Sequence, residues 1–96
     1  MNPIYLDYNA TTPLDAEVLA AMMPYLTNVF GNAISFHHFG RQAAAGLEKA
    51  RQQVASLLKC QPDEVIFTGG GTESNNTVIQ GLARQLAPRG KHIITS

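Results

Sequence analysis

The sequence has few residues that could form cross-links or a metal cluster. Its 96 residues include one cysteine, Cys60, no tryptophan and three histidines. A single cysteine excludes an internal disulfide framework and any metal site built from several cysteines, and it fits a reducing compartment. His37 and His38 are adjacent, so their side chains point apart, and no carboxylate stands at ligand spacing beside them. We therefore expect no metal site. No base is placed beside Cys60, so we interpret it as a semi-buried residue rather than a nucleophile.

Charge is scarce and balanced. Charged residues make up 15% of the sequence and the formal net charge is zero, without a basic patch, so we expect no direct nucleic-acid binding. Apolar residues make up 45%, as in a folded rather than a disordered chain. The opening MNPIYLDYNATT lacks the charged-then-apolar pattern of a signal peptide, and no apolar run is long enough to cross a bilayer. We expect a cytoplasmic chain, without a membrane partner, that forms at most one small domain.

Hydrophobic periodicity predicts three helices. The first begins after Asp15, its predicted N-cap, and Pro24 should kink or shorten it. The second covers residues 41–59, where apolar residues recur at spacings of three and four. The third follows three glycines, with Thr72 as its predicted N-cap. Residues 30–40 have no clean periodicity, so we predict a loop there.

Two short apolar stretches, residues 65–68 and 92–94, lie on either side of the third helix and are predicted strands. Strand, helix and strand within about thirty residues form a βαβ unit, which normally implies a parallel sheet with a right-handed crossover. The expected fold class is therefore α/β. Because the chain stops inside the second of these strands, we expect it to be a fragment of a longer protein.

The segment FTGGGTESNN, residues 67–76, marks the turn from the first predicted strand into the third helix. Such turns place unpaired amides at the carboxyl edge of a sheet, where ligands bind. Glycines leave room for a phosphate, the helix dipole attracts it, and the Thr72 hydroxyl can donate to it. No Lys-Ser/Thr pair follows Gly71, and Ser74 stands where the dinucleotide fingerprint needs glycine, so neither ATP nor NAD is favoured. The alternative is that the glycines simply make a tight turn, and the local sequence does not choose between the two.

Four separated blocks together resemble the amino-terminal portion of a cysteine desulfurase of the NifS/IscS type, within the class V aminotransferases of the fold-type I pyridoxal-phosphate enzymes. The blocks, in the family's order, are YLDYNATTP at 5–13, FGN with His37 and FGR at 30–41, PDEVIFT with GGTESNN at 62–76, and GKHIITS at 90–96. The resemblance implies the start of a fold-type I large domain, with helices followed by a βαβ unit of a mostly parallel sheet. Residues 1–40 would form a segment near the active site, and residues 41–96 the helix and βαβ start of the large domain.

The resemblance also implies site residues. The family's Gly–Ala/Gly–Thr step holds the cofactor phosphate, which places that contact on Gly71 and Thr72. The DYNATT loop of the family lies by the active site, so Asn9, Ala10 and Thr11 become candidates for the wall of the substrate pocket, although such polar loops are also common as self-bonded turns. No catalytic residue is expected here, because the family's Schiff-base lysine, stacking histidine, pyridine-pairing aspartate and mobile-loop cysteine all lie beyond Ser96.

For an intact protein, the resemblance implies a homodimer with pyridoxal 5′-phosphate as cofactor and L-cysteine as substrate. Sulfur would leave as an enzyme persulfide, with alanine as the other product, and would pass to an iron–sulfur scaffold or another acceptor, indirectly including thiolated tRNA. We expect these 96 residues to be inactive alone. The alternatives are another class V enzyme, such as a selenocysteine lyase or an aminotransferase, and a non-catalytic truncated α/β module that binds a partner.

Overall fold

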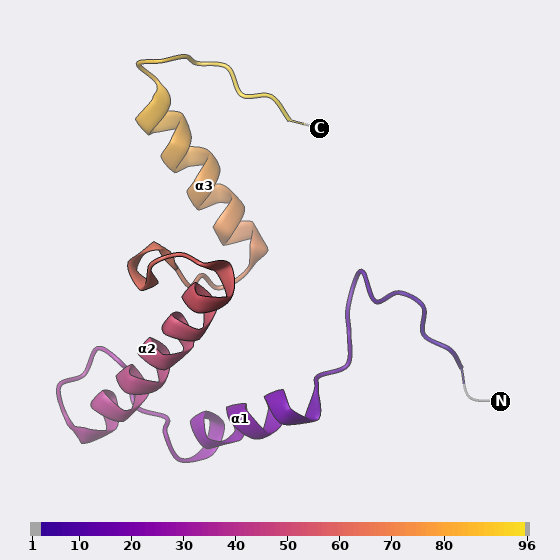
Figure 1. Cartoon of the computed structure of the whole chain (residues 1–96), viewed down its shortest axis with the longest axis vertical. Coiled ribbons are helices and arrows are strands. Elements are labelled where there is room, and N and C mark those ends of the chain that lie inside the picture. Colours follow the sequence, from indigo (N-terminus) through magenta and orange to yellow (C-terminus); the bar gives the residue numbers. More distant parts are fainter. Residues whose placement is uncertain (1–2, 96) are drawn as a thin grey trace.

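The computed structural model describes residues 3–95, which form an open chain of helices rather than layers around a core (Figure 1). The elements are α1 (Ala16–Thr27), α2 (His38–Leu58), the short 3₁₀ helix η1 (Pro62–Glu64) and α3 (Gly71–Leu86). The elements follow one another in chain order, and the segment before α1 and the segment after α3 extend away from them. None of the described helices is both long and apolar enough to cross a bilayer.

The first helix begins where the sequence predicted. Asp15 is its N-cap, and the Asp15 carboxylate accepts hydrogen bonds from the amides of Glu17 at 2.8 Å and Val18 at 3.4 Å. Pro24 lies inside α1, and the helix ends one turn later because the amides of Asn28 and Val29 both bond to the Pro24 carbonyl. The helix continues for three residues beyond Pro24, so the proline does not itself end α1, and its effect as a kink or a shortening stays a prediction.

The second helix begins three residues earlier than the sequence predicted. His37 is its N-cap, with Nδ1 accepting from the Gly40 amide at 3.3 Å, so the loop prediction for residues 30–40 is wrong for its last three positions. Sequence reasoning missed this start because histidine is not among the preferred N-cap residues. The preceding loop packs closely on the helix, since a Cβ on Gly40 would run into the carbonyls of Asn32 and Ser35.

The end of α2 turns the chain toward the glycine loop. Lys59 adopts a left-handed conformation with φ 56°, and its amide bonds to the carbonyls of Ala55 and Ser56. The chain then passes through η1, which packs against α2. Ala55 and Val65 are buried where these two elements meet. This small contact fixes the direction in which residues 65–68 approach α3.

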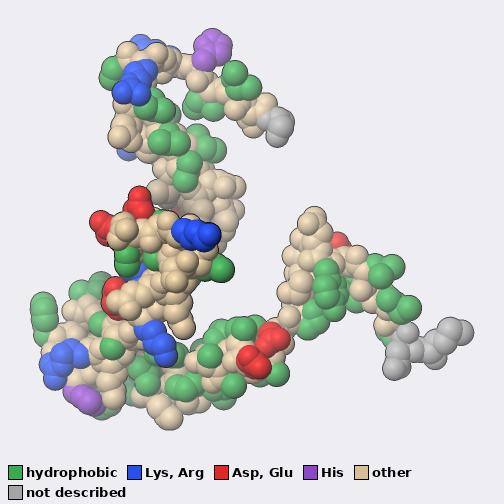
Figure 2. All heavy atoms as spheres, in the orientation of Figure 1, with side chains coloured by type: hydrophobic (Ala, Val, Ile, Leu, Met, Phe, Trp, Pro, Cys, Tyr) green, Lys and Arg blue, Asp and Glu red, His purple; other side chains and the backbone are tan. Residues whose placement is uncertain are grey.

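Almost no apolar surface is buried in the part of the chain that the structure describes. Apart from Gly40, only Ala55 and Val65 are buried, while Phe36 is 93% and Leu6 88% exposed. Hydrophobic side chains consequently lie open on every part of the surface in view (Figure 2). The radius of gyration is 18.5 Å, against about 12.5 Å expected for a compact domain of this length. Most apolar side chains of the described helices therefore remain at least partly exposed.

The predicted strands at residues 65–68 and 92–94 do not form in the described structure, and the predicted βαβ unit is absent from it. Both segments lack regular secondary structure, and α3 separates them. A strand is stabilised by backbone hydrogen bonds to a neighbouring strand, and no segment among residues 3–95 pairs with either one. The sequence pattern of each segment is that of a buried strand, but a strand also needs a neighbouring strand to pair with, which a local pattern does not reveal.

Candidate phosphate-binding site

The third helix starts directly in the glycine run. Gly70 is its N-cap, with extended backbone at φ 162° and ψ 176°, and Gly71 is its first residue. Thr72 therefore lies inside the first turn, and its prediction as the N-cap is wrong. Because glycine has no side chain, no side-chain cap occupies this end of the helix. The Thr72 hydroxyl makes no hydrogen bond to any described residue and is free to donate to a ligand.

Four consecutive amides at the start of α3 have no acceptor among residues 3–95. They belong to residues 70–73, and the first bond of the helix runs from the Ser74 amide to the Gly70 carbonyl at 3.1 Å. The Gly69 amide is different, because the Glu73 carboxylate accepts it at 2.6 Å. Unpaired amides at a helix start, together with the positive end of the helix dipole, form a ready site for an anion.

The glycines leave open space around these amides. The chain bends at Gly69 and Gly70, and none of the described glycines has a left-handed backbone, so the bend does not depend on the conformational freedom peculiar to glycine. A Cβ placed on Gly70 or Gly71 would meet no heavy atom within 4 Å. The space that side chains would fill here is empty, which fits a group that approaches the backbone closely.

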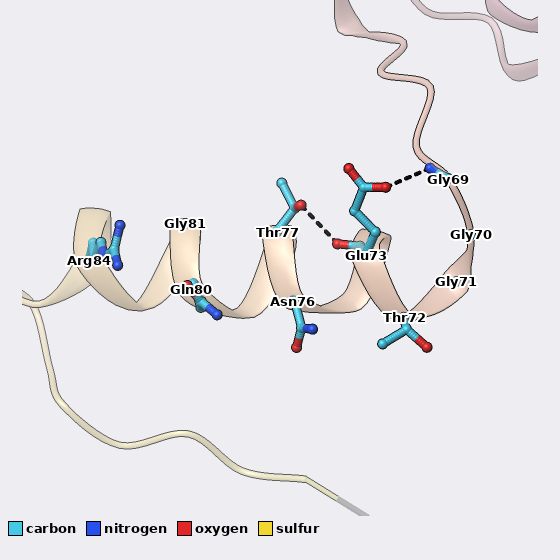
Figure 3. A pocket seen from close by; sticks show the side chains of 10 residues that line it. All are labelled: Gly69, Gly70, Gly71, Thr72, Glu73, Asn76, Thr77, Gln80, Gly81 and Arg84. Carbon is cyan, nitrogen blue, oxygen red and sulfur yellow. Dashed lines mark hydrogen bonds between the residues drawn. The ribbon is translucent and has the colours of Figure 1, made fainter.

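A wide, open groove of about 860 Å³ runs from the glycine loop along α3 (Figure 3). Ten residues line it: Gly69, Gly70, Gly71, Thr72, Glu73, Asn76, Thr77, Gln80, Gly81 and Arg84. The side chains of Thr72 and Asn76 project to one side of the helix, and those of Glu73 and Thr77 to the other. Apart from the glycines, the residues that line it have polar or charged side chains, and Arg84 is the cation among them, at the end of the groove far from Gly70.

Side-chain hydrogen bonds hold the loop in place. The hydroxyls of Thr68 and Ser74 lie 2.6 Å apart and share a hydrogen bond, which ties the approach segment to the first turn of α3. The Thr68 hydroxyl also lies 3.2 Å from the Gly70 carbonyl. Sequence reasoning did not single out either hydroxyl, because a Thr and a Ser six residues apart carry no signal until the turn between them is known.

The second group of predicted site residues lies elsewhere. The amides of Ala10 and Thr11 both bond to the Asp7 carbonyl, at 3.0 and 3.3 Å, and the Thr11 hydroxyl shares a 2.6 Å hydrogen bond with that of Tyr5. Asn9 belongs to the same exposed turn. This self-bonded turn projects beyond α1, away from α3 (Figure 1), so the structure does not bring these residues to the glycine loop.

Cys60 and His37, two other residues considered in the sequence, take part in local structure rather than in the groove. Cys60 is partly buried, as predicted, and its amide bonds to the Ala55 carbonyl at 3.0 Å behind the left-handed turn. His37 caps α2, and its ring lies edge-on to that of Phe39, with centroids 6.2 Å apart. Among residues 3–95, no three His, Cys, Asp or Glu side chains gather closely enough to hold a metal ion.

Comparison with known proteins assigns the chain to a family. Residues 4–96 match the model of the class-V aminotransferases, and the chain belongs to that family. It is similar over nearly its whole length to proteins named cysteine desulfurase. The cysteine desulfurase IscS of Dictyoglomus turgidum is 55% identical over 93 residues, which cover 97% of this chain and 24% of that relative.

Similar proteins from other organisms carry the same name. The human cysteine desulfurase is 54% identical over 97 aligned positions, covering 100% of this chain and 21% of the relative. The cysteine desulfurase IscS of a Neisseria meningitidis serogroup C strain is 50% identical over 94 positions, covering 97% of this chain and 23% of the relative. The chain thus spans about a quarter or less of the length of the relatives it matches, and the family resemblance seen in the sequence motifs is confirmed.

Proposed function

We propose that this chain supplies the cofactor-phosphate site of a pyridoxal-phosphate-dependent cysteine desulfurase. The observation that carries the proposal is the set of unpaired amides at residues 70–73, which open onto empty space at the start of α3. The resemblance of the sequence motif predicted the phosphate contact at Gly71 and Thr72, and both residues lie within that set. Physical argument and similarity therefore point to the same short stretch of backbone.

The chain's own residues have defined tasks in this proposal. The amides of residues 70–73 donate to the phosphate oxygens, and the positive end of the α3 dipole lowers the energy of the dianion. The Thr72 hydroxyl adds one further donor, while Thr68 and Ser74 hold the loop in register. When bound, the cofactor supplies an electron sink for chemistry at the substrate's α-carbon. The lysine and cysteine that such chemistry needs are not assigned to any residue of this chain.

In the longer protein, residues 65–68 and 92–94 form strands of a parallel sheet, with α3 as the crossover between them. That arrangement places the glycine loop at the carboxyl edge of the sheet. The turn at Asn9, Ala10 and Thr11 would then form part of the substrate pocket wall. L-Cysteine is the proposed substrate, and the proposed cytoplasmic homodimer passes sulfur to an iron–sulfur scaffold or another acceptor.

A chimera tests this function. The matching segment of the Dictyoglomus turgidum relative is replaced by this chain, whose 55% identity favours compatible packing. We expect the chimera to retain pyridoxal 5′-phosphate through gel filtration and to release alanine and sulfide from L-cysteine at a rate within about tenfold of the unmodified relative. A chimera that folds with native helical content but loses the cofactor would refute the proposal. Faster turnover of L-selenocysteine than of L-cysteine would instead favour a selenocysteine lyase.

A further inference from the structure

Arg51 of α2 makes three contacts, two of them to the segment leading into the glycine loop and one within its own helix. Its Nη1 donates a hydrogen bond to the Val65 carbonyl. Its Cζ lies 5.1 Å from the centroid of the Phe67 ring, within the range of a cation–π interaction. Its Nε lies 3.6 Å from the Glu48 carboxylate, one turn earlier on the same helix. The side chain is 26% exposed, so these contacts are partly shielded from water.

Apart from the burial of Val65 and the bond of its amide to the Pro62 carbonyl at 3.2 Å, the segment that Arg51 contacts has few other interactions. Among residues 3–95, the backbone groups of Ile66 and Phe67 make no hydrogen bond, and the Val65 carbonyl is bound by Arg51 alone. The next residue, Thr68, is joined to the first turn of α3 through Ser74. A continuous series of contacts therefore runs from α2, through Arg51 and residues 65–68, to the amides of the glycine loop.

We propose that Arg51 is a positioning residue for the phosphate site: it fixes the angle at which residues 65–68 enter α3 and thereby aims the free amides at one point. The inference rests on the proposed function, because it concerns the same loop and the same phosphate. Arg51 does not line the groove and acts only through the segment that it clamps.

The geometry requires arginine rather than a general cation. The guanidinium donates from Nη1 to the Val65 carbonyl, holds Cζ over the Phe67 ring and places Nε near the Glu48 carboxylate at the same time. A lysine ammonium is a compact point charge on a flexible stem, so it can replace one of these contacts but not all three. The Arg51→Lys variant is therefore expected to be intermediate between the native side chain and Arg51→Met.

A matched control is available on the same helix. Arg41 also donates from Nη1 to a backbone carbonyl, that of Phe36 at 2.6 Å, but at the opposite end of α2 from the glycine loop. Both Arg→Met substitutions remove one such bond and one charge from α2. A general loss of stability should follow from either, whereas a loss of phosphate contact should follow only from the change at Arg51.

The test uses the cofactor-loaded chimera and compares the dissociation constants of pyridoxal 5′-phosphate and of pyridoxal, which lacks the phosphate. Arg51→Met should weaken the binding of pyridoxal 5′-phosphate about tenfold and keep the dissociation constant of pyridoxal within about twofold. Arg51→Lys should lose less affinity for pyridoxal 5′-phosphate. Arg41→Met should change neither dissociation constant. Two results would overturn the role of Arg51: equal weakening of the binding of both ligands, or an unchanged preference for the phosphate form in Arg51→Met. If Arg51→Met does not fold, the same comparison is made with Arg51→Lys. An unsubstituted chimera that binds the two ligands equally would instead overturn the phosphate site itself.

Discussion

The ring of Tyr25 in α1 lies against the backbone of Gly46 in α2, in the space where a side chain at position 46 would begin. Glycine inside a helix is about 0.5–1 kcal/mol less stable than alanine, because it loses more conformational freedom on folding. At Gly46 the close approach of Tyr25 offsets part of that loss, and it joins α1 to α2 in a structure with few other contacts between helices.

Replacing Gly46 by alanine should destabilise the packing of α1 on α2. Overpacking against the Tyr25 ring costs about 1–3 kcal/mol, which exceeds the gain in helix propensity. Gly81→Ala is the matched control, because a Cβ there meets nothing within 4 Å and only the propensity gain remains. The melting temperature of the chain, followed by circular dichroism, should therefore fall for Gly46→Ala and rise for Gly81→Ala. A rise for both variants would contradict the proposed contact between Tyr25 and Gly46.

Gly70→Val should block the phosphate site without disturbing α3. The extended backbone of Gly70 suits valine, and its Cβ meets no protein atom, so helical content should stay within error of the native chain. The side chain would stand in the space left for the phosphate, and cofactor retention by the chimera should fall at least about tenfold. Gly71→Ala is the control, since its Cβ also meets no heavy atom within 4 Å and a single methyl group adds much less bulk than valine. Full retention of cofactor in Gly70→Val would show that the phosphate lies elsewhere.

Thr72→Val should weaken phosphate binding while leaving the fold intact. The Thr72 hydroxyl bonds to no described residue, so its loss costs no internal hydrogen bond, whereas a bond to a charged ligand is worth about 1.5–3 kcal/mol, or roughly ten- to hundredfold in affinity. Thr77→Val removes a hydroxyl one turn later that bonds to the Glu73 carbonyl at 2.8 Å. Titration of each chimera with pyridoxal 5′-phosphate should show the loss at position 72 only, and equal losses would point to a general effect on α3.

His37→Ala should fray the start of α2. The imidazole Nδ1 accepts the Gly40 amide, and loss of an N-cap acceptor costs about 0.5–2 kcal/mol. His37→Asn restores a preferred capping side chain and should recover most of the helical signal in circular dichroism. If asparagine fails to recover what alanine loses, the ring contact with Phe39, rather than the cap, is the stabilising interaction.

The isolated 96-residue chain should not release sulfide from L-cysteine above the background given by free pyridoxal 5′-phosphate. The groove beside the glycines is lined by Glu73 and Arg84 as its only ionisable groups among the described residues, and it offers no thiol and no lysine amine to form a covalent link. Sulfide detection with a matched protein-free reaction checks this. Release that depends on the chain would require a reactive group that the site does not contain.

Local signals in the sequence were sufficient for the helices. Asp15 caps α1 because its carboxylate reaches the next amides, and that interaction is complete within four residues. The predicted cap at Thr72 was wrong by two positions. The N-cap is Gly70, which has no side chain to bond the first amides and therefore gives no capping signal in the sequence. The start of α2 was missed because its cap, His37, does bond through its side chain, but with a ring nitrogen that capping preferences rarely consider.

The strands could not be confirmed because their stability is not local. Residues 65–68 carry the composition of a buried strand, but a ladder needs a second segment at hydrogen-bonding distance, and the described chain provides an arginine instead. The same limit applies to the site. The glycines and Thr72 could be proposed as phosphate ligands from one short stretch of sequence and its family resemblance, whereas the contact between Arg51 and Val65 joins residues fourteen apart.

The open arrangement of the helices has a consequence for experiments in solution. With a Cα radius of gyration of 18.5 Å, this 10.4 kDa chain should scatter X-rays like a considerably heavier globule and elute early from a sizing column. Adding the complementary part of a desulfurase as a separate polypeptide would then offer a direct readout of assembly. Docking should contract the labelled chain toward about 12.5 Å, visible by contrast-matched neutron scattering before any turnover is measured.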